Sequence, residues 1–207
     1  MILLKWLKRL MKKVNLANSL ISLIVGLGNP GDEYSKTRHN AGFLFLDVLA
    51  ESMGVVFSYE AKFKAQMAKG FLAGRPVRLL KPQTYMNKSG YSVSGCVRYF
   101  EIPEEEVLIV HDELDLEPGV VRLKKGGGHG GHNGLRDIIA CLSTKEFYRL
   151  RLGVGHPGDR KKVVDYVLKS PSKAHALLFE DAVDRVLHEI PGICRGEYQA
   201  VMQRLHT

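Results

Sequence analysis

A run of glycines in the second half of the chain constrains the fold more than any other feature. Residues 126–134 read GGGHGGHNG, and the apolar residues that follow recur at helical spacing as far as Leu142. Glycine loses more conformational freedom on folding than any other residue, so such a run indicates positive φ angles or close approach to a ligand. A flexible linker is the alternative, but linkers rarely carry histidines and an asparagine directly before a helix. The run is therefore predicted to deliver His132 and Asn133 to a helix entrance, where free N–H groups favour anions or carbonyl oxygens.

Short apolar segments alternate with amphipathic segments on both sides of the glycine run. Strands are predicted over residues 20–25, 64–72, 77–80, 106–112, 120–124 and 148–155, and helices over 41–53, 89–100, 170–190 and 193–205. The first segment is nearly all apolar, which is typical of a strand covered on both faces of a parallel sheet. This alternation predicts an α/β sandwich, a mixed, mostly parallel twisted sheet with helices on both faces. With 207 residues, 45% of them hydrophobic, the chain suits a single domain.

The first twenty residues differ in composition from the rest. Five cations are interleaved with apolar residues before Val14, and no acidic residue precedes Asp32. A signal peptide would place its charges first and an unbroken apolar stretch second. Residues 1–20 are therefore predicted to be a basic extension outside the core fold, and residues 21–207 a single catalytic domain. A helix lying on a membrane or on nucleic acid, or an organelle transit peptide, remains an alternative for the extension.

Net charge and cysteine content indicate what kind of partner the chain binds and in which compartment it occurs. Thirty basic and 22 acidic side chains give a net charge of +8, which favours a polyanionic partner such as nucleic acid. No apolar run approaches the ~20 residues of a membrane span, so no membrane association is expected for the domain. The three cysteines are far apart and form no CxxC motif, as expected for free thiols in a reducing compartment, which predicts a cytoplasmic location.

Polar residues gather just beyond the ends of predicted strands. Asn29 follows the first strand, Asp112 ends the strand over 106–112, and the glycine run follows the strand over 120–124. Ligands in α/β sheets collect at the carboxyl ends of strands, so these residues are expected in one cleft.

A dinucleotide site must be weighed, because residues 26–31 match G-x-G-x-x-G. In a Rossmann turn the third glycine opens a helix whose N–H groups point at the pyrophosphate. Here Pro30 removes one donor, and a polar stretch delays the apolar helix by about two turns. The nearest acid at the expected spacing, Glu51, falls within a predicted helix. The match is therefore not taken as a dinucleotide site.

His39 is the candidate general base. An imidazole has an ordinary pKa of ~6.5, which suits proton abstraction from water near neutral pH, but it needs a carboxylate to fix its tautomer. Asp112 comes first beyond its strand and is the expected partner. Glu113 and Asp115 are expected in a solvated acidic turn before Pro118.

Other chemistries find less support in the sequence. Four histidines and Asp112 offer possible metal ligands, but HExxH and paired cysteine spacings are absent, so no metal is expected. No G-x-S-x-G motif marks a serine nucleophile, no cysteine has a neighbouring histidine in a recognisable pattern, and no P-loop motif occurs.

A second polar cluster, KPQTYMNKSG, occupies residues 81–90. Asn87 or Ser89 could cap the following helix, with Tyr85 and Met86 buried in the core. Alternatively, the amides of Asn87 and Asn133, which both donate and accept, suit a peptide group or an ester carbonyl. A basic rim for phosphates is expected from Lys124, Lys125, Arg136, Arg149 and Arg151, unless these are dispersed surface charges.

Taken in order, these motifs resemble the bacterial peptidyl-tRNA hydrolase family. The resemblance rests on IVGLGNPG at 24–31 followed by Tyr34, TRHNAG at 37–42, KPQTYMNKSG at 81–90, HDELDL at 111–116, the glycine run, and RLR at 149–151. It covers about residues 21 to 190. The basic extension departs from the family pattern and leaves the start site open.

The resemblance implies hydrolysis of the ester that joins a peptide to the terminal ribose of tRNA, which returns the tRNA to translation. It implies that His39 activates water, that Asp112 supports its basic form, and that Asn29 favours substrates with an acylated α-amino group. Tyr34, Tyr85, Asn87, Asn133 and His132 are implied to contact substrate, and Lys124 and Arg151 to lie on the tRNA side. No metal or organic cofactor and no stable protein partner is implied, and the chain is expected to be a monomer.

Two other functions remain open from the sequence. A different hydrolase on the same scaffold, such as an aminopeptidase-like esterase, would not require tRNA for turnover. A non-catalytic RNA-binding module would bind RNA without releasing a product, whether or not His39 is present.

Overall fold

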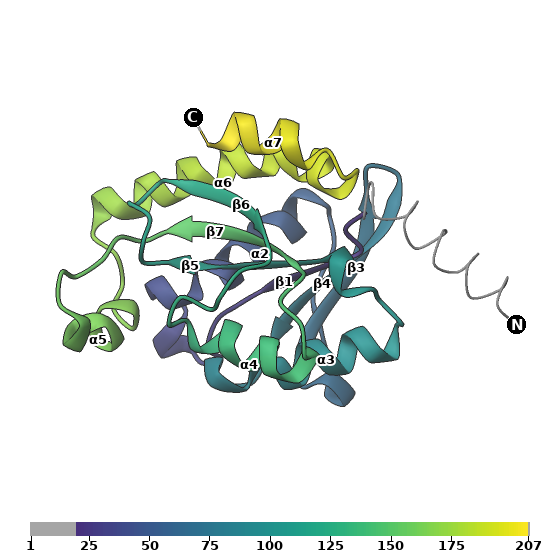
Figure 1. Ribbon diagram of the computed structural model, residues 1–207, viewed down its shortest axis with the longest axis horizontal. Coiled ribbons are helices and arrows are strands. Elements are labelled where there is room, and N and C mark those ends of the chain that lie inside the picture. The colour runs from purple at the N-terminus through teal and green to yellow at the C-terminus, as the bar shows by residue number, and fades with distance from the viewer. Residues whose placement is uncertain (1–19, 207) are drawn as a thin grey trace, which may run out of the picture.

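One mixed sheet lies between two layers of helices in the computed structural model, which describes residues 20–206 (Figure 1). The seven strands are β1 (Leu23–Gly26), β2 (Ser58–Glu60), β3 (Ala65–Leu72), β4 (Arg75–Pro82), β5 (Val107–Glu113), β6 (Val121–Lys125) and β7 (Tyr148–Gly153), in the spatial order β2-β3-β4-β1-β5-β7-β6. The four central strands run parallel, and β2, β3 and β6 pair antiparallel at the edges. The predicted α/β sandwich with a mixed sheet is confirmed.

Helices cover both faces of the sheet. The longer helices are α2 (Ala41–Ser52), α3 (Ser89–Tyr99), α4 (Asn133–Leu142), α6 (Lys173–Cys194) and α7 (Tyr198–Leu205). Short 3-10 turns occupy Asp32–Tyr34 (η1), Arg38–Asn40 (η2), Ala61–Phe63 (η3), Met86–Lys88 (η4), Glu104–Glu106 (η5) and Arg160–Lys162 (η6). Helices α2, α6 and α7 share one hydrophobic cluster with the sheet, and α3 and α4 share the other. The short helix α5 (Val163–Val167) stands beside the carboxyl ends of the strands, away from both layers (Figure 1).

The central strands are buried on both faces, as their apolar sequences predict. In β1, Ile24 belongs to the cluster beneath α2, while Leu23 and Val25 belong to the cluster beneath α3 and α4. Alternate side chains of a strand point to opposite faces, so a strand covered on both sides needs apolar residues throughout. The core therefore fixes β1 and β5 side by side, with their carboxyl ends at the same edge.

Helix α6 continues through Pro191, where the sequence predicted its end, so that prediction is wrong. A proline inside a helix costs about 3 kcal/mol, because it removes one hydrogen bond and crowds the preceding turn. The residues beyond it, Ile193 and Cys194, are fully buried against the sheet. Burying an apolar side chain of this kind contributes about 1.5–3 kcal/mol, so their burial offsets the cost.

Two glycines bring the start of α2 against the sheet. A Cβ atom on Gly26 would collide with the backbone of Gly42, and a Cβ atom on Gly42 would collide with the backbone of Leu27 and Val110. Only hydrogen atoms fit in both places, so the helix start packs directly on β1 and β5. This contact carries the turn containing His39 to the carboxyl end of β5.

The basic extension predicted at residues 1–20 lies almost wholly outside the described residues. Within 20–206, no helix combines the length and the apolar character needed to cross a membrane.

Candidate active site

A cavity of about 450 Å³ opens at the carboxyl ends of β1 and β5. Its walls contain Asn29 after β1, Asp112 on β5, and His132 and Asn133 from the glycine run. The three polar clusters that the sequence placed beyond strand ends therefore meet in one cleft. The turn η2 adds His39 to the same walls.

His39 and Asp112 form a close pair within this cavity. The Nδ1 atom of His39 lies 2.9 Å from Oδ1 and 3.0 Å from Oδ2 of Asp112. A carboxylate only accepts, so Nδ1 carries the proton and Nε2 retains a lone pair. The His39 side chain is 12% exposed and that of Asp112 is 2% exposed, so the pair sits at the base of the cavity with only the imidazole reaching solvent.

His132 is the second partner of the Asp112 carboxylate. Its Nε2 lies 3.1 Å from Oδ1, and its Nδ1 accepts hydrogen bonds from the backbone N–H groups of Gly134 and Leu135 at the start of α4. Because Nδ1 accepts, Nε2 must carry the proton and donate it to Asp112. His132 is thus the N-cap of α4, and neither of its ring nitrogens has a lone pair left for a substrate proton.

The charges of this network set the pKa values of its members. Burial opposes ionisation of His39, but the charge of Asp112 and its hydrogen bond outweigh burial and raise the pKa of His39 above 6.5. Burial also opposes ionisation of Asp112, yet His39 and His132 hold the pKa of that carboxyl well below its ordinary value. Burial, with a smaller contribution from His132, lowers the pKa of neighbouring His111 to about 3. Asp112 is therefore the negative charge that stabilises an imidazolium at position 39.

The Asn29 side chain is locked in one orientation. Its Oδ1 accepts from the backbone N–H of Met86 at 2.8 Å. Its backbone N–H and carbonyl both bond to the Asn40 amide, at 2.8 and 3.0 Å. The Nδ2 amino group forms no hydrogen bond with any residue of 20–206, so it remains available as a donor in the cavity wall.

Tyr85, Asn87 and Asn133 line the same cavity from its exposed side. Neither Asn87 nor Ser89 caps α3, whose N-cap is Lys88 without a side-chain bond, and Tyr85 is 62% exposed rather than in the core. The alternative is therefore wrong for the cap and for Tyr85, whereas its placement of Met86 in the core is confirmed. Tyr34, at the end of η1, is not among the residues that line the cavity.

Arg149 does not belong to a basic rim, so that prediction is wrong. The residue is only 3% exposed, and its Nη1 and Nη2 donate to the carbonyl oxygens of Gly128 and Gly127. A buried guanidinium needs such acceptors, and the glycine run supplies them because its backbone has no side chains in the way. Arg149 thus holds the glycine run in place, and a φ of 98° at Gly127 is a conformation that favours glycine.

Glu113 also differs from its prediction, because it is part of β5 rather than of a solvated turn. Its Oε2 accepts from Nε of Arg151 at 2.9 Å, and its side chain is 14% exposed. Arg151 is therefore engaged at the cavity edge, whereas Lys124, on the neighbouring strand β6, is exposed.

His39, Asp112 and His132 are also the residues of 20–206 that could hold a metal ion, with ligand atoms within 4.8 Å of one another. Two nitrogens of this group already form hydrogen bonds, because Nδ1 of His39 and Nε2 of His132 each give a proton to Asp112. An ion would have to displace both protons and both bonds. The arrangement fits a proton-transfer network better than a metal site.

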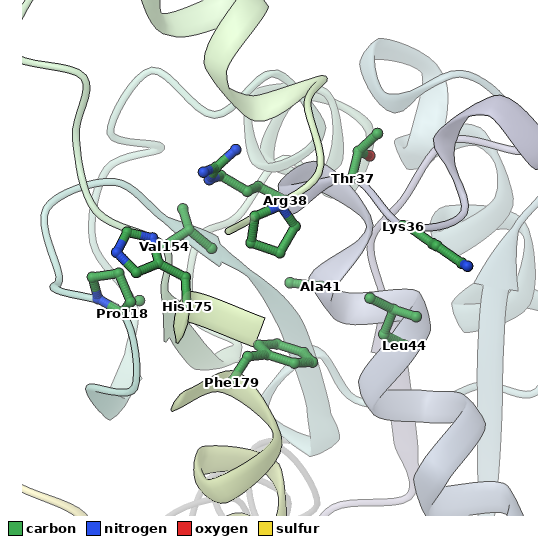
Figure 2. A pocket seen from close by; sticks show the side chains of 11 residues that line it. Lys36, Thr37, Arg38, Ala41, Leu44, Pro118, Val154, His175 and Phe179 are labelled. Carbon is green, nitrogen blue, oxygen red and sulfur yellow. The ribbon is translucent and has the colours of Figure 1, made fainter. Parts of the chain in front are cut away.

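A second, smaller cavity of about 40 Å³ adjoins the turn η2 (Figure 2). It lies between Lys36, Thr37 and Arg38 on one side and His175 and Phe179 of α6 on the other. Its other walls are mostly apolar, and none of the residues predicted to act on the substrate lines it.

Two features of the site escaped the sequence analysis. Asn40 fixes the backbone of Asn29, and its only signal was its place in the TRHNAG motif. One wall of the cavity is apolar and comes from Val163, Val164, Val167 and Leu168 of α5 and the residue after it. No periodicity marked this short helix, so only the structure places it at the cleft.

Comparison with known proteins identifies the family. The family model for peptidyl-tRNA hydrolase matches residues 23–207. The chain is 56% identical over 187 residues to a peptidyl-tRNA hydrolase of Nitrosomonas europaea, covering 90% of this chain and 96% of that protein. It is 50% identical over 190 residues to the enzyme of Neisseria meningitidis, covering 92% and 99%. The crystal structure of the Acinetobacter baumannii enzyme superposes with a TM-score of 0.89 at 47% identity, covering 91% and 95%. The chain therefore belongs to the peptidyl-tRNA hydrolase family.

Proposed function

We propose that this chain hydrolyses the ester between a peptide and the terminal ribose of tRNA, with His39 as the base that activates water. Hydrolysis of peptidyl-tRNA follows from membership of the family. The residue roles rest on one observation above all: the Nδ1 proton of His39 bonds to Asp112 and leaves the lone pair of Nε2 at the cavity.

The reaction needs one proton transfer in each direction. Nε2 of His39 takes a proton from water while the water oxygen bonds to the ester carbonyl carbon. The carbon–oxygen bond to the ribose then breaks, and the imidazolium returns the proton to the ribose oxygen. Asp112 stabilises the imidazolium between these steps, and His132 holds the carboxylate in position from its other side.

The developing negative charge on the carbonyl oxygen requires donors. The exposed amides of Asn87 and Asn133, or backbone N–H groups near them, are placed in the cavity wall for this role. Neither amide is committed elsewhere among the described residues, so both are free to bond to substrate.

Asn29 accounts for a preference for acylated substrates. Its Oδ1 is occupied by the Met86 N–H group, so it offers only the Nδ2 donor to the cavity. An acyl carbonyl accepts from that donor, whereas a free α-ammonium group brings only donors and a positive charge. The locked orientation therefore favours peptidyl-tRNA over aminoacyl-tRNA.

The phosphates of tRNA lie along the edge of the sheet formed by β6 and β7, where Lys124 is exposed and Arg151 pairs with Glu113 of the cavity wall. We place the reaction in the cytoplasm, because peptidyl-tRNA is formed there during translation and because free cysteines are typical of a reducing compartment. The domain comprises residues 21–207, which agrees with the segment matched by the family model, and the basic extension lies outside it.

One incubation tests the function. N-acylaminoacyl-tRNA and free aminoacyl-tRNA are supplied in parallel, together with an N-acylamino acid ester that lacks tRNA, and acyl release is measured. Release from the first substrate alone is expected. Rapid hydrolysis of the simple ester would favour a general esterase, and binding of tRNA without release would favour an RNA-binding module.

A further inference from the structure

The apolar wall of the cleft, which α5 carries, is held to the rest of the molecule mainly by polar contacts. Residues 155–172, here called the α5 flap, connect β7 to α6 and carry α5 (Figure 1). The flap contributes four apolar side chains to the cavity, among them Val164, which is 62% exposed. Of these four side chains only Val167 is buried, so apolar packing holds this short helix weakly and polar contacts must help to fix its position.

Arg38 provides most of these contacts. Its Nη1 group lies 3.2 Å from the carbonyl oxygen of Tyr166, 3.0 Å from that of Lys169 and 3.0 Å from that of Ser170. Its backbone N–H also donates to the Lys169 carbonyl, at 3.2 Å. A helix end leaves carbonyl groups without partners, and one positively charged donor satisfies several of them.

Stacking adds to these hydrogen bonds. The Arg38 guanidinium carbon lies 4.0 Å from the centre of the Tyr166 ring, and the Tyr166 hydroxyl donates to the Val154 carbonyl at 2.7 Å. Tyr166 is thus held between Arg38 and Val154, the residue that follows β7. Among the described residues, Arg38 is the one charged side chain outside the flap that donates hydrogen bonds to flap carbonyls.

Arg38 directly precedes His39 in η2, so the same turn carries the base and the contact to the flap. We propose that Arg38 is a positioning residue, a latch that holds the α5 flap beside His39 so that the apolar wall packs against the peptide of the substrate. The reading of the wall as a peptide contact rests on the proposed function, whereas the latch itself does not.

A phosphate contact is the competing role for an arginine in a tRNA-dependent enzyme. Nη1 of Arg38 is already shared by three carbonyl groups, and Nε is buried. Lys36, two residues earlier, is exposed, and its side chain leaves the turn in the opposite direction (Figure 2). Lys36 therefore serves as a matched control: it carries the same charge two residues before Arg38 and forms no hydrogen bond with the flap.

The experiment compares Arg38→Met, Arg38→Lys and Lys36→Met with the unchanged full-length chain. Amide hydrogen exchange over residues 163–170 is measured without substrate, and kcat and KM are measured with N-acylaminoacyl-tRNA at several salt concentrations and several pH values. Losing charge-assisted bonds should speed exchange in the flap of Arg38→Met by about tenfold or more. KM should rise by about tenfold, with kcat within about threefold. For Arg38→Lys, the exchange rate and KM should lie between those of Arg38→Met and those of the unchanged chain. For Lys36→Met, both should match the unchanged chain.

Tyr166→Leu provides a second variant, because it removes the stacking partner of Arg38 and the hydroxyl bond to Val154 without altering the His39 turn. It should also speed exchange in the flap, and it keeps the proposal testable if Arg38→Met does not fold.

Unchanged exchange in both Arg38→Met and Tyr166→Leu would overturn the latch. A fall in kcat with constant KM and a shifted pH profile would instead place Arg38 in support of His39. A shallower salt dependence with normal exchange would show a phosphate contact. If the unchanged chain released no acyl group, the proposed function would fail, but the exchange measurement would still decide the latch because it needs no substrate.

Discussion

The two sides of the cleft differ in how far they are ordered before substrate arrives. On the buried side, His39, Asp112 and His132 hold one another through hydrogen bonds of 2.9 to 3.1 Å, and Asp112 is almost inaccessible. On the exposed side, the amides of Asn87 and Asn133 form no hydrogen bond with any residue of 20–206. Proton transfer benefits from groups held in place, whereas donors to substrate must stay open. The folded chain thus completes one side by itself and leaves the other for the substrate.

The largest effect should come from the buried side. Replacing the base in His39→Ala should lower kcat by at least ~100-fold, because the other imidazoles that line the cavity, His129 and His132, already use their lone pairs to accept backbone N–H groups. Single-turnover acyl release measures the loss, and tRNA binding should be nearly unchanged. The control is His188→Ala, which replaces an exposed histidine on α6. Turnover close to that of the unchanged chain would remove His39 from the mechanism.

The pH dependence of activity in Asp112→Asn should test whether His39 is the group that titrates. The carboxylate raises the pKa of His39, so activity is expected to fall on the acid side with a midpoint above 6.5. Removing the charge leaves burial alone, which lowers the pKa, so the midpoint should move to lower pH. The plateau rate should fall by at least about tenfold, because an amide stabilises the imidazolium poorly. A midpoint that stays in place would mean that another group titrates.

Replacing Asn29 or Asn133 should affect the free energy of unfolding differently, because only Asn29 forms a buried hydrogen bond within residues 20–206. Asn29→Ala leaves the buried Met86 N–H without its acceptor and should lower the free energy of unfolding by about 1–3 kcal/mol. Asn133→Ala removes no internal bond and should change it by less than about 0.5 kcal/mol, while kcat/KM falls about tenfold. Denaturant titrations and initial rates provide both values. Equal destabilisation by the two variants would contradict the contrast between the sides.

The smallest effect should come from the exposed basic edge. Lys124→Ala should weaken tRNA binding a few-fold and reduce the slope of log affinity against log salt by about one, as expected for one lost phosphate contact. Binding titrations over a range of salt concentrations test this, with Lys36→Ala as control. An unaltered slope would show that Lys124 contacts no phosphate.

Much of the fold could be predicted because its signals are local. The apolar strands β1 and β5, and helix α2, which begins within the TRHNAG motif, follow from periodicity and glycine punctuation. The carboxyl ends of the two strands locate the cleft. The wrong predictions concern side chains whose partners lie far away. Arg149 bonds to Gly127 and Gly128, more than twenty residues distant, and Glu113 bonds to Arg151 on another strand. A charge pattern cannot tell a buried arginine with carbonyl partners from one that faces phosphate.

The sequence by itself determined the sheet, its two helical layers and the set of residues that could carry the chemistry, because apolar periodicity and short motifs are written along the chain. Tertiary structure decided how each imidazole is used. His39 and His132 both bond to Asp112, but α4 occupies the second nitrogen of His132 with its N–H groups and leaves the second nitrogen of His39 open. That difference depends on where a helix begins relative to a strand twenty residues earlier in the chain, which no local pattern records.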